Sequence, residues 1–213
     1  MIQDVTAKDL VVLAADKQIE FAVRGLLHRK ATLGIQNLSF DVFVHPHHDP
    51  GCLTHAHEFL RPFSARYARA LVMLDRFGSG RHESVCEDLE KEIEGRLCGT
   101  GWGNRAAAIV LDPELEIWVW SNSPHVDRIL GWEGRIPNLK AWLKEQGFLL
   151  PGHVKPQRPK EAMEEALKIV KKPRSSAIYR DLAESVSLTG CADRAFIKFK
   201  QLLASWFGGM TYE

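Results

Sequence analysis

Acidic residues follow three of the four β-strands that the sequence predicts. They are Asp16, Asp75, Glu114 and Glu116. Because the carboxyl ends of parallel strands meet at one edge of a sheet, we expect Asp16 and Asp75 to lie together there. Crowded carboxylates repel one another unless a cation neutralises them, and Mg²⁺ takes carboxylate ligands while keeping bound water. The pattern therefore predicts a Mg²⁺ (or Mn²⁺) site, although a single Asp also ends strands simply because it forms turns.

A second group with metal-binding chemistry lies between residues 45 and 57. Its members are His45, His47, His48, Asp49, Cys52, His55 and His57. Imidazole, thiolate and carboxylate are ligands of zinc, but the spacing matches no zinc finger and no HExxH helix. Two interpretations stay open, a polar loop beside the acidic edge and a zinc site. His45 directly follows a predicted strand and is a candidate catalytic base or phosphate ligand.

Basic residues gather near the C-terminus, in residues 155–174. Lys155, Arg158 and Lys160 begin this run and form a candidate surface for the phosphates of nucleic acid. The alternative is a solvated helix face with intrahelical Glu–Lys pairs. The glycine-containing loop at 77–81 likewise allows two interpretations, an anion-binding loop and an ordinary turn between a strand and a helix.

The elements that must position these residues alternate between strand and helix. Short apolar or alternating runs predict strands at 10–15, 39–44, 68–75 and 106–112. Helical spacing predicts helices at 16–30, 54–68, 83–98, 113–121, 136–147, 160–171, 174–186 and 192–207. The order predicts an α/β fold, with a mostly parallel four-stranded sheet flanked by helices and an all-helical C-terminal subdomain. We expect domains at 1–122 and 123–213, and we expect Trp118 to be buried.

Composition limits the classes of function. The 213 residues carry a net charge of +1, so no basic field for nucleic acid surrounds the whole molecule. Residues 1–150 carry −3 and residues 151–213 carry +4, so any such contact is expected in a patch. No apolar run approaches the ~20 residues of a membrane helix, and the N-terminus does not resemble a signal peptide. Four cysteines without a CxxC motif predict free thiols in a reducing cytoplasm.

Several segments resemble the Toprim family, in its OLD-type and defence-associated branch. Asp16-Lys17-Gln18-Ile19-Glu20 resembles the first acidic motif, with Asp in place of the first Glu. Asp75-Arg76-Phe77 resembles the Asp-x-Asp motif, with Phe77 in place of the second Asp. Glu114-Leu115-Glu116-Ile117-Trp118 resembles the Glu-x-Glu-x-Trp segment. The phrases HPHHDPGC, SPHV and KPQRPKEA also look like the small Toprim-like component of methylation-associated antiphage defence systems.

The resemblance implies a metal-dependent phosphoesterase or nuclease that acts on nucleic acid with other defence proteins. Asp16 and Asp75 would bind the metal directly, while Glu20 and Glu116 would bind it or orient its waters. The resemblance also implies that three cations balance phosphate charge. They are Lys17, Arg76 and Arg81. The alternative, which rests on Phe77, is a catalytically inactive Toprim-like module that binds a partner protein or nucleic acid.

Overall fold

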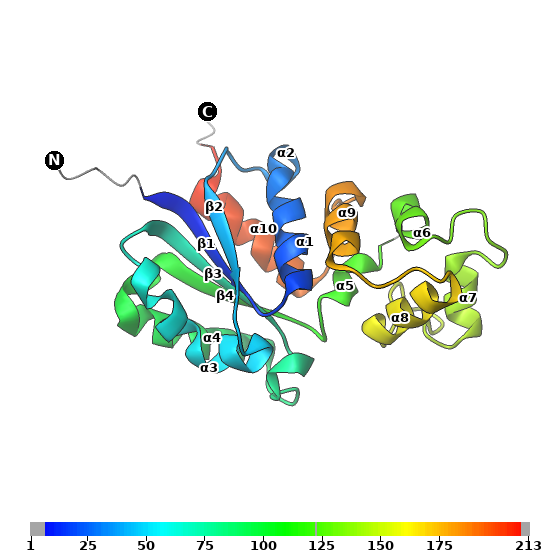
Figure 1. Ribbon diagram of the computed structural model, residues 1–213, viewed down its shortest axis with the longest axis horizontal. Helices are drawn as coiled ribbons and strands as arrows, with labels where there is room; N and C mark the ends of the chain where they lie inside the picture. The colour runs from blue at the N-terminus through cyan, green and yellow to red at the C-terminus, as the bar shows by residue number, and fades with distance from the viewer. Residues whose placement is uncertain (1–6, 122, 210–213) are drawn as a thin grey trace.

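The sheet has four parallel strands. A computed structural model describes residues 7–121 and 123–209. The strands are β1 (Lys8–Ala14), β2 (Phe40–Val44), β3 (Tyr67–Asp75) and β4 (Ala106–Leu111), in the spatial order β2-β1-β3-β4. All three pairings are parallel, and Val12 of β1 lies between Val42 and Leu71. The α/β fold with a four-stranded parallel sheet flanked by helices is therefore confirmed (Figure 1).

Both faces of the sheet are covered by helices. In Figure 1, α1 (Lys17–His28) and α10 (Arg194–Phe207) lie on one face, and α3 (His48–Leu60) and α4 (Cys86–Leu97) lie on the other. The two central strands, β1 and β3, are continuous buried apolar runs, because a strand covered on both faces has no polar side. The connection after β1 leads to β2 on one side of β1, and the connection after β2 leads to β3 on the other side of β1. The direction in which strands are added therefore reverses between β1 and β3, and open α/β sheets place their ligands at the carboxyl ends of such strands.

Glutamates of α4 cover the outer edge of β4. Glu90 Oε1 accepts a hydrogen bond of 2.9 Å from the backbone N–H of Val110, and Glu94 Oε1 accepts one of 2.9 Å from that of Ala108. Two cations of α10 pair with these glutamates at N–O distances of 3.0 to 3.2 Å. They are Arg194 and Lys198. Helices far apart in sequence are thereby fixed to the same strand edge.

The helices that follow β4 occupy two regions. They are α5 (Glu116–Val119), α6 (Pro124–Leu130), α7 (Leu139–Glu145), α8 (Pro159–Ile169), α9 (Ser176–Ser185) and α10. Helices α6, α7 and α8 lie at the end of the molecule away from the sheet, whereas α9 lies beside α1 and α10 covers the sheet (Figure 1). The boundary predicted after residue 122 coincides with a residue outside the described part of the chain. The division into two domains stays a prediction.

Short helical turns complete the connections. They are α2 (Lys30–Leu33), η1 (Arg61–Phe63), η2 (Phe77–Ser79), η3 (Cys98–Trp102) and η4 (Gly103–Arg105). At η2, Gly78 is required because a Cβ atom there would overlap the carboxylate of Asp49 on α3. This close approach joins the loop after β3 to the start of α3.

Two predicted helices, at 54–68 and 113–121, have different bounds in the structure. The helix predicted at 54–68 begins instead at His48, because Pro50 lies in its first turn, where its missing N–H costs nothing. The helix predicted at 113–121 is a single turn, α5, and Pro113 lies before it. Trp118 in that turn is only partly buried, because it packs under the first turn of α10 rather than in the sheet core.

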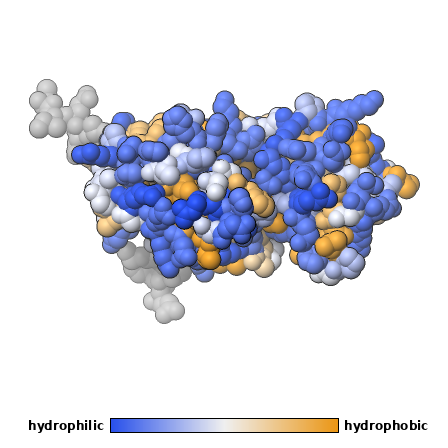
Figure 2. All heavy atoms as spheres, turned by 90° about the horizontal axis from the view of Figure 1, so that it is seen from below, coloured by the Kyte–Doolittle hydropathy of each residue, from blue (hydrophilic) through white to orange (hydrophobic). Residues whose placement is uncertain are grey.

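Hydrophilic side chains predominate on the face seen in Figure 2, and the apolar ones there form small groups. Within residues 7–121 and 123–209, no helix combines the length and the apolar composition that a membrane span requires.

Candidate metal centre

Asp75 is the last residue of β3, and both its carboxylate and its backbone N–H have hydrogen-bond partners. The side chain accepts a hydrogen bond of 2.9 Å on Oδ1 from the backbone N–H of Leu115. The backbone N–H of Asp75 donates to Asp49 Oδ1 at 2.7 Å. Only 8% of Asp75 is exposed. The loop after β4 therefore holds the carboxylate, and the start of α3 fixes the backbone that carries it.

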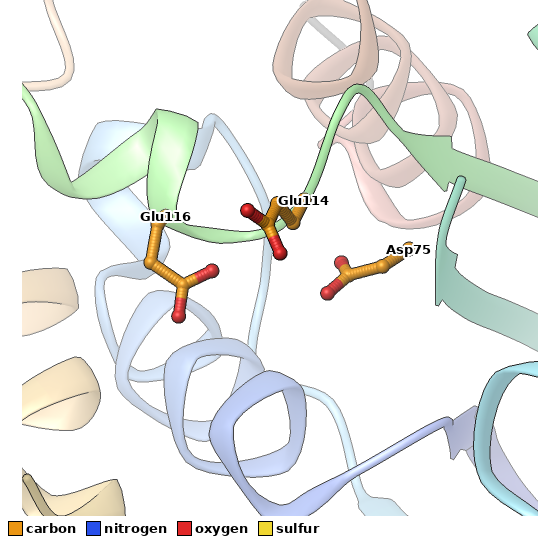
Figure 3. Close-up of side chains that lie close together, drawn as sticks. All are labelled: Asp75, Glu114 and Glu116. Carbon is orange, nitrogen blue, oxygen red and sulfur yellow. The ribbon is translucent and has the colours of Figure 1, made fainter. Parts of the chain in front are cut away.

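Glu114 and Glu116 join Asp75 to form the acidic cluster. One oxygen of each carboxylate lies within 4.8 Å of an oxygen of the other two. Figure 3 shows the three carboxylates directed towards a common space, with Asp75 from the strand end, Glu114 from the loop before α5 and Glu116 from the first turn of α5. This geometry suits one cation with several oxygen ligands.

Residues of α8, of α9 and of the loop between them hold the two glutamates. Glu116 is 2% exposed, and its Oε1 accepts hydrogen bonds from Tyr179 Oη at 2.5 Å and from Arg174 Nη2 at 2.6 Å. Lys160 Nζ lies 3.4 Å from Glu114 Oε2. The basic C-terminal part of the chain thus supplies cations to the acidic edge of the sheet.

Two further aspartates lie near the cluster. Asp16 caps α1 by accepting a hydrogen bond of 2.8 Å from the N–H of Ile19, and its charge acts on that of Asp75. Asp49, in the first turn of α3, lies against Asp75 and Gly78. Asp16 is nevertheless not a member of the group of carboxylates within 4.8 Å.

Burial and mutual repulsion oppose ionisation of these acids. Burial raises the pKa of Asp75 well above its ordinary value, and the charges of Asp49, Glu116 and Asp16 raise it further. Burial also raises the pKa of Asp16, Asp49 and Glu114, in each case against hydrogen bonds or cations that lower it. A bound cation would stabilise the ionised carboxylates against the effects of burial and mutual repulsion.

The donor set fits a hard divalent cation. The protein contacts of Glu116 use Oε1, the ion pair of Glu114 uses Oε2, and the hydrogen bond of Asp75 uses Oδ1. In the described part of the chain, no protein donor contacts the second oxygen of any of the three. An all-oxygen set of this kind favours Mg²⁺ or Mn²⁺ over softer ions.

Among the predicted catalytic residues, Glu20 and His45 are engaged elsewhere. Glu20 Oε1 accepts a hydrogen bond of 2.9 Å from Arg24, one turn along α1. The buried ring of His45 packs against Phe59, and its Nδ1 accepts a hydrogen bond of 3.1 Å from the N–H of His47. Neither belongs to the group within 4.8 Å, so Asp75 and Glu116 are the two predicted residues that the structure brings together.

Most of the predicted phosphate-binding cations have protein partners. Arg76 pairs with Asp112 at 2.8 Å, and Arg81 lies 3.7 Å from Glu92. Lys155 Nζ donates to the carbonyl of Ile117 at 2.7 Å, and Arg158 pairs with Glu161 at 2.5 Å. Lys17 is exposed beside Asp16. Lys160 is the predicted cation that reaches the acidic cluster, where it contacts a glutamate.

The histidine-rich segment contains the start of α3, which begins at His48. His48 Nδ1 lies 3.1 Å from the carbonyl oxygen of Ala15, and His55 Nδ1 lies 2.6 Å from Thr54 Oγ1. Among residues 7–121 and 123–209, the cluster of Asp75 with the two glutamates is the one group with metal-ligand geometry. The structure therefore does not support the zinc interpretation.

Sequence reasoning missed three residues of this site. For Asp49 the sequence leaves a polar loop and a zinc site open, although Pro50 after it is a signal for the first turn of a helix. Arg174 and Tyr179 reach Glu116 across 58 and 63 residues, and no local pattern shows such a contact.

No family model, curated protein or solved structure matches this chain.

Proposed function

We propose that the acidic cluster binds Mg²⁺ or Mn²⁺ and that the protein hydrolyses phosphodiester bonds of nucleic acid. The observation that supports this is the convergence of Asp75, Glu114 and Glu116 at the carboxyl edge of a parallel sheet. The resemblance of the acidic motifs to Toprim proteins adds the substrate class. From the longer phrases that resemble the small Toprim-like defence component, we further propose that the protein acts in a prokaryotic antiphage system in the cytoplasm, alongside other defence proteins.

The divalent cation would polarise the scissile phosphate and stabilise the leaving oxygen. Asp75, Glu114 and Glu116 would hold it through the oxygens that contact no protein donor. Tyr179 and Arg174 fix the orientation of Glu116, so the ligand set is organised before the ion binds. Lys17, exposed next to Asp16, is the predicted cation with access to a substrate phosphate.

Removing the charge of Asp75 tests this function. Asp75→Asn preserves the shape of the side chain but removes a ligand, so Mg²⁺- or Mn²⁺-dependent cleavage of DNA or RNA should fall at least about a hundredfold. Calorimetry should show the same loss for metal binding. Asp88→Asn, at an exposed acid on α4 whose ion pair among the described residues is with Lys91, is the matched control. Unchanged cleavage by purified Asp75→Asn protein would contradict the proposal.

A second candidate is a catalytically inactive Toprim-like module that binds a partner protein or nucleic acid. Two observations favour it. Both glutamates of the cluster already have a cation as partner, Arg174 for Glu116 and Lys160 for Glu114. Phe77, at the position where the family motif has an acid, is 54% exposed. This candidate predicts no heat of Mg²⁺ binding and no cleavage, together with a stable complex with the product of a neighbouring gene. Calorimetry therefore separates the two candidates.

A further inference from the structure

A cavity of about 590 Å³ lies beside α5. Its walls come from α1, α5, α9, the start of α10 and the loop at 187–193. A volume of this size lies within the range of roughly 300–1,000 Å³ that is typical of small-molecule sites. The hydrolysis proposed above assigns no role to it.

The walls of the cavity are aromatic and aliphatic. Trp118, Trp120, Tyr179 and Phe196 contribute four aromatic side chains. The rings of Trp118 and Phe196 meet edge to face with their centroids 5.3 Å apart. Aromatic walls favour an aromatic occupant, because rings pack against one another in offset and edge-to-face geometries.

The charged side chains in the wall have partners. Lys155 Nζ donates to the carbonyl of Ile117 at 2.7 Å. Asp193 Oδ1 accepts hydrogen bonds from Trp118 Nε1 at 2.8 Å and from the N–H of Phe196 at 2.9 Å. A charged occupant would lose its hydration without gaining an unpaired counter-ion, so the walls favour a neutral one.

One polar group in the wall has no partner. Ser121 Oγ is buried, and among the described residues it makes no hydrogen bond. Buried polar groups are generally satisfied, and a hydroxyl can both donate and accept a hydrogen bond. Ser121 is one of the residues that line the cavity, so rotation about its Cα–Cβ bond would bring one hydrogen-bonding hydroxyl to an occupant.

We propose that this cavity is a binding site for a neutral aromatic molecule that carries one hydrogen-bonding group. Aromatic walls, paired charges and the buried hydroxyl of Ser121 define this class of ligand together. Binding does not depend on the proposed metal chemistry, so the two are tested separately.

Cys191 provides a reporter because it is a free, partly exposed thiol that lines the cavity, whereas Cys98 is an exposed free thiol in η3 that does not. The test treats the full-length protein in EDTA with N-ethylmaleimide, with or without 2-naphthol, and measures both thiols by mass spectrometry. At about ten times its Kd, 2-naphthol should slow modification of Cys191 roughly tenfold. Modification of Cys98 should not change. An unchanged rate at Cys191 up to the solubility limit of 2-naphthol, or equal slowing of both thiols, would overturn the proposal.

Two comparisons test the class of the ligand. Naphthalene-2-sulfonate has the same rings but a negative charge, and equal protection of Cys191 by this anion would overturn the assignment of a neutral ligand. Ser121→Ala removes one hydroxyl from the wall and should weaken 2-naphthol binding about fivefold, as the loss of one hydrogen bond does. Unchanged affinity in this variant would remove Ser121 from the site. Ser205→Ala, an exposed serine in α10, is the matched control.

Discussion

Arg174 connects the C-terminal part of the chain to the acidic cluster. Its guanidinium donates to Glu116 at 2.6 Å, to Glu164 at 2.8 Å and to Tyr179 at 2.9 Å. Glu116 is nearly fully buried, so the loss of this cation would leave an uncompensated charge beside Asp75. The stability of the fold and the chemistry of the site therefore depend on the same residue.

Arg174→Met should destabilise the protein by about 3 kcal/mol, as the breaking of a buried ion pair does. If the cluster binds metal, Mg²⁺ should stabilise this variant more than the unmodified protein, because the added cation replaces the lost one. Urea unfolding with MgCl₂ or with EDTA measures both effects. Arg158→Met, which breaks an exposed pair with Glu161, should cost less than about 1 kcal/mol. Equal losses in the two variants would contradict the assigned role of Arg174.

His45 makes stability depend on pH. Burial lowers its pKa below the ordinary 6.5, and the charges of His47, His55 and His48 lower it further. Below pH 6.5 the unfolded chain therefore takes up a proton that the folded protein does not, and the free energy of unfolding falls as the pH falls. His45→Asn should reduce this fall, since the amide oxygen can accept the same hydrogen bond from His47.

The measurement is urea unfolding at pH 7.5 and pH 5.5. His82→Asn, at an exposed histidine, is the control. An equal fall in stability for His45→Asn and the unmodified protein would exclude His45 as the cause.

At the scale of elements, α1 and α9 pack closely at Gly25. A Cβ atom at this position would lie 2.9 Å from both the Cβ of Ala183 and the carbonyl oxygen of Arg180. The two helices can approach to this distance only because residue 25 has no side chain. Since α9 also carries Tyr179, this packing helps to place the hydroxyl that holds Glu116.

Gly25→Ala should therefore destabilise the protein by about 1–3 kcal/mol through overpacking. Gly95→Ala, in α4, is a matched control, because a Cβ atom there would meet nothing within 4 Å. That substitution should be neutral or stabilise the protein by up to about 1 kcal/mol, as Gly to Ala does inside a helix. Thermal unfolding of both variants checks this, and a stable Gly25→Ala protein would show that the interface can expand.

The sheet could be predicted from the sequence, whereas the complete site could not. Apolar runs such as that of β3 are local signals, and the strand ends at Asp75 followed directly from them. The segment around Asp49 looked like a turn because His, Asp and Pro are common in turns, although Pro is equally suited to the first turn of a helix. The Toprim resemblance implies Asp16 and Asp75 as the direct metal ligands, whereas the geometry groups Asp75 with Glu114 and Glu116.

At the scale of the whole molecule, basic residues of the C-terminal part pair with acidic residues at the edge of the sheet. From the sequence, residues 155–174 are a candidate nucleic-acid surface. In the structure, Lys160 and Arg174 turn towards the carboxylates at the sheet edge. Their partners are far away in sequence, so spacing alone could not distinguish an exposed patch from an internal counter-charge.

The edge of β4 is another place where distant segments meet. Glu90 is buried and joins the strand N–H of Val110 to Arg194 and Lys198 of α10. Glu90→Gln should destabilise the protein by about 3 kcal/mol because it leaves two cations without their buried partner. Glu87→Gln, at a half-exposed glutamate that lies 3.4 Å from Arg194, should cost less than about 1 kcal/mol. Chemical denaturation compares the two, and similar losses would mean that α10 is held mainly by its apolar face.

The same edge limits how other chains can associate with this one. A free strand edge offers backbone groups to any extended segment, which can then continue the sheet. At β4 the N–H groups of Val110 and Ala108 are occupied by carboxylates that are themselves paired with cations. A strand added there would have to displace both glutamates and break their ion pairs. Strand addition at β4 is therefore unfavourable.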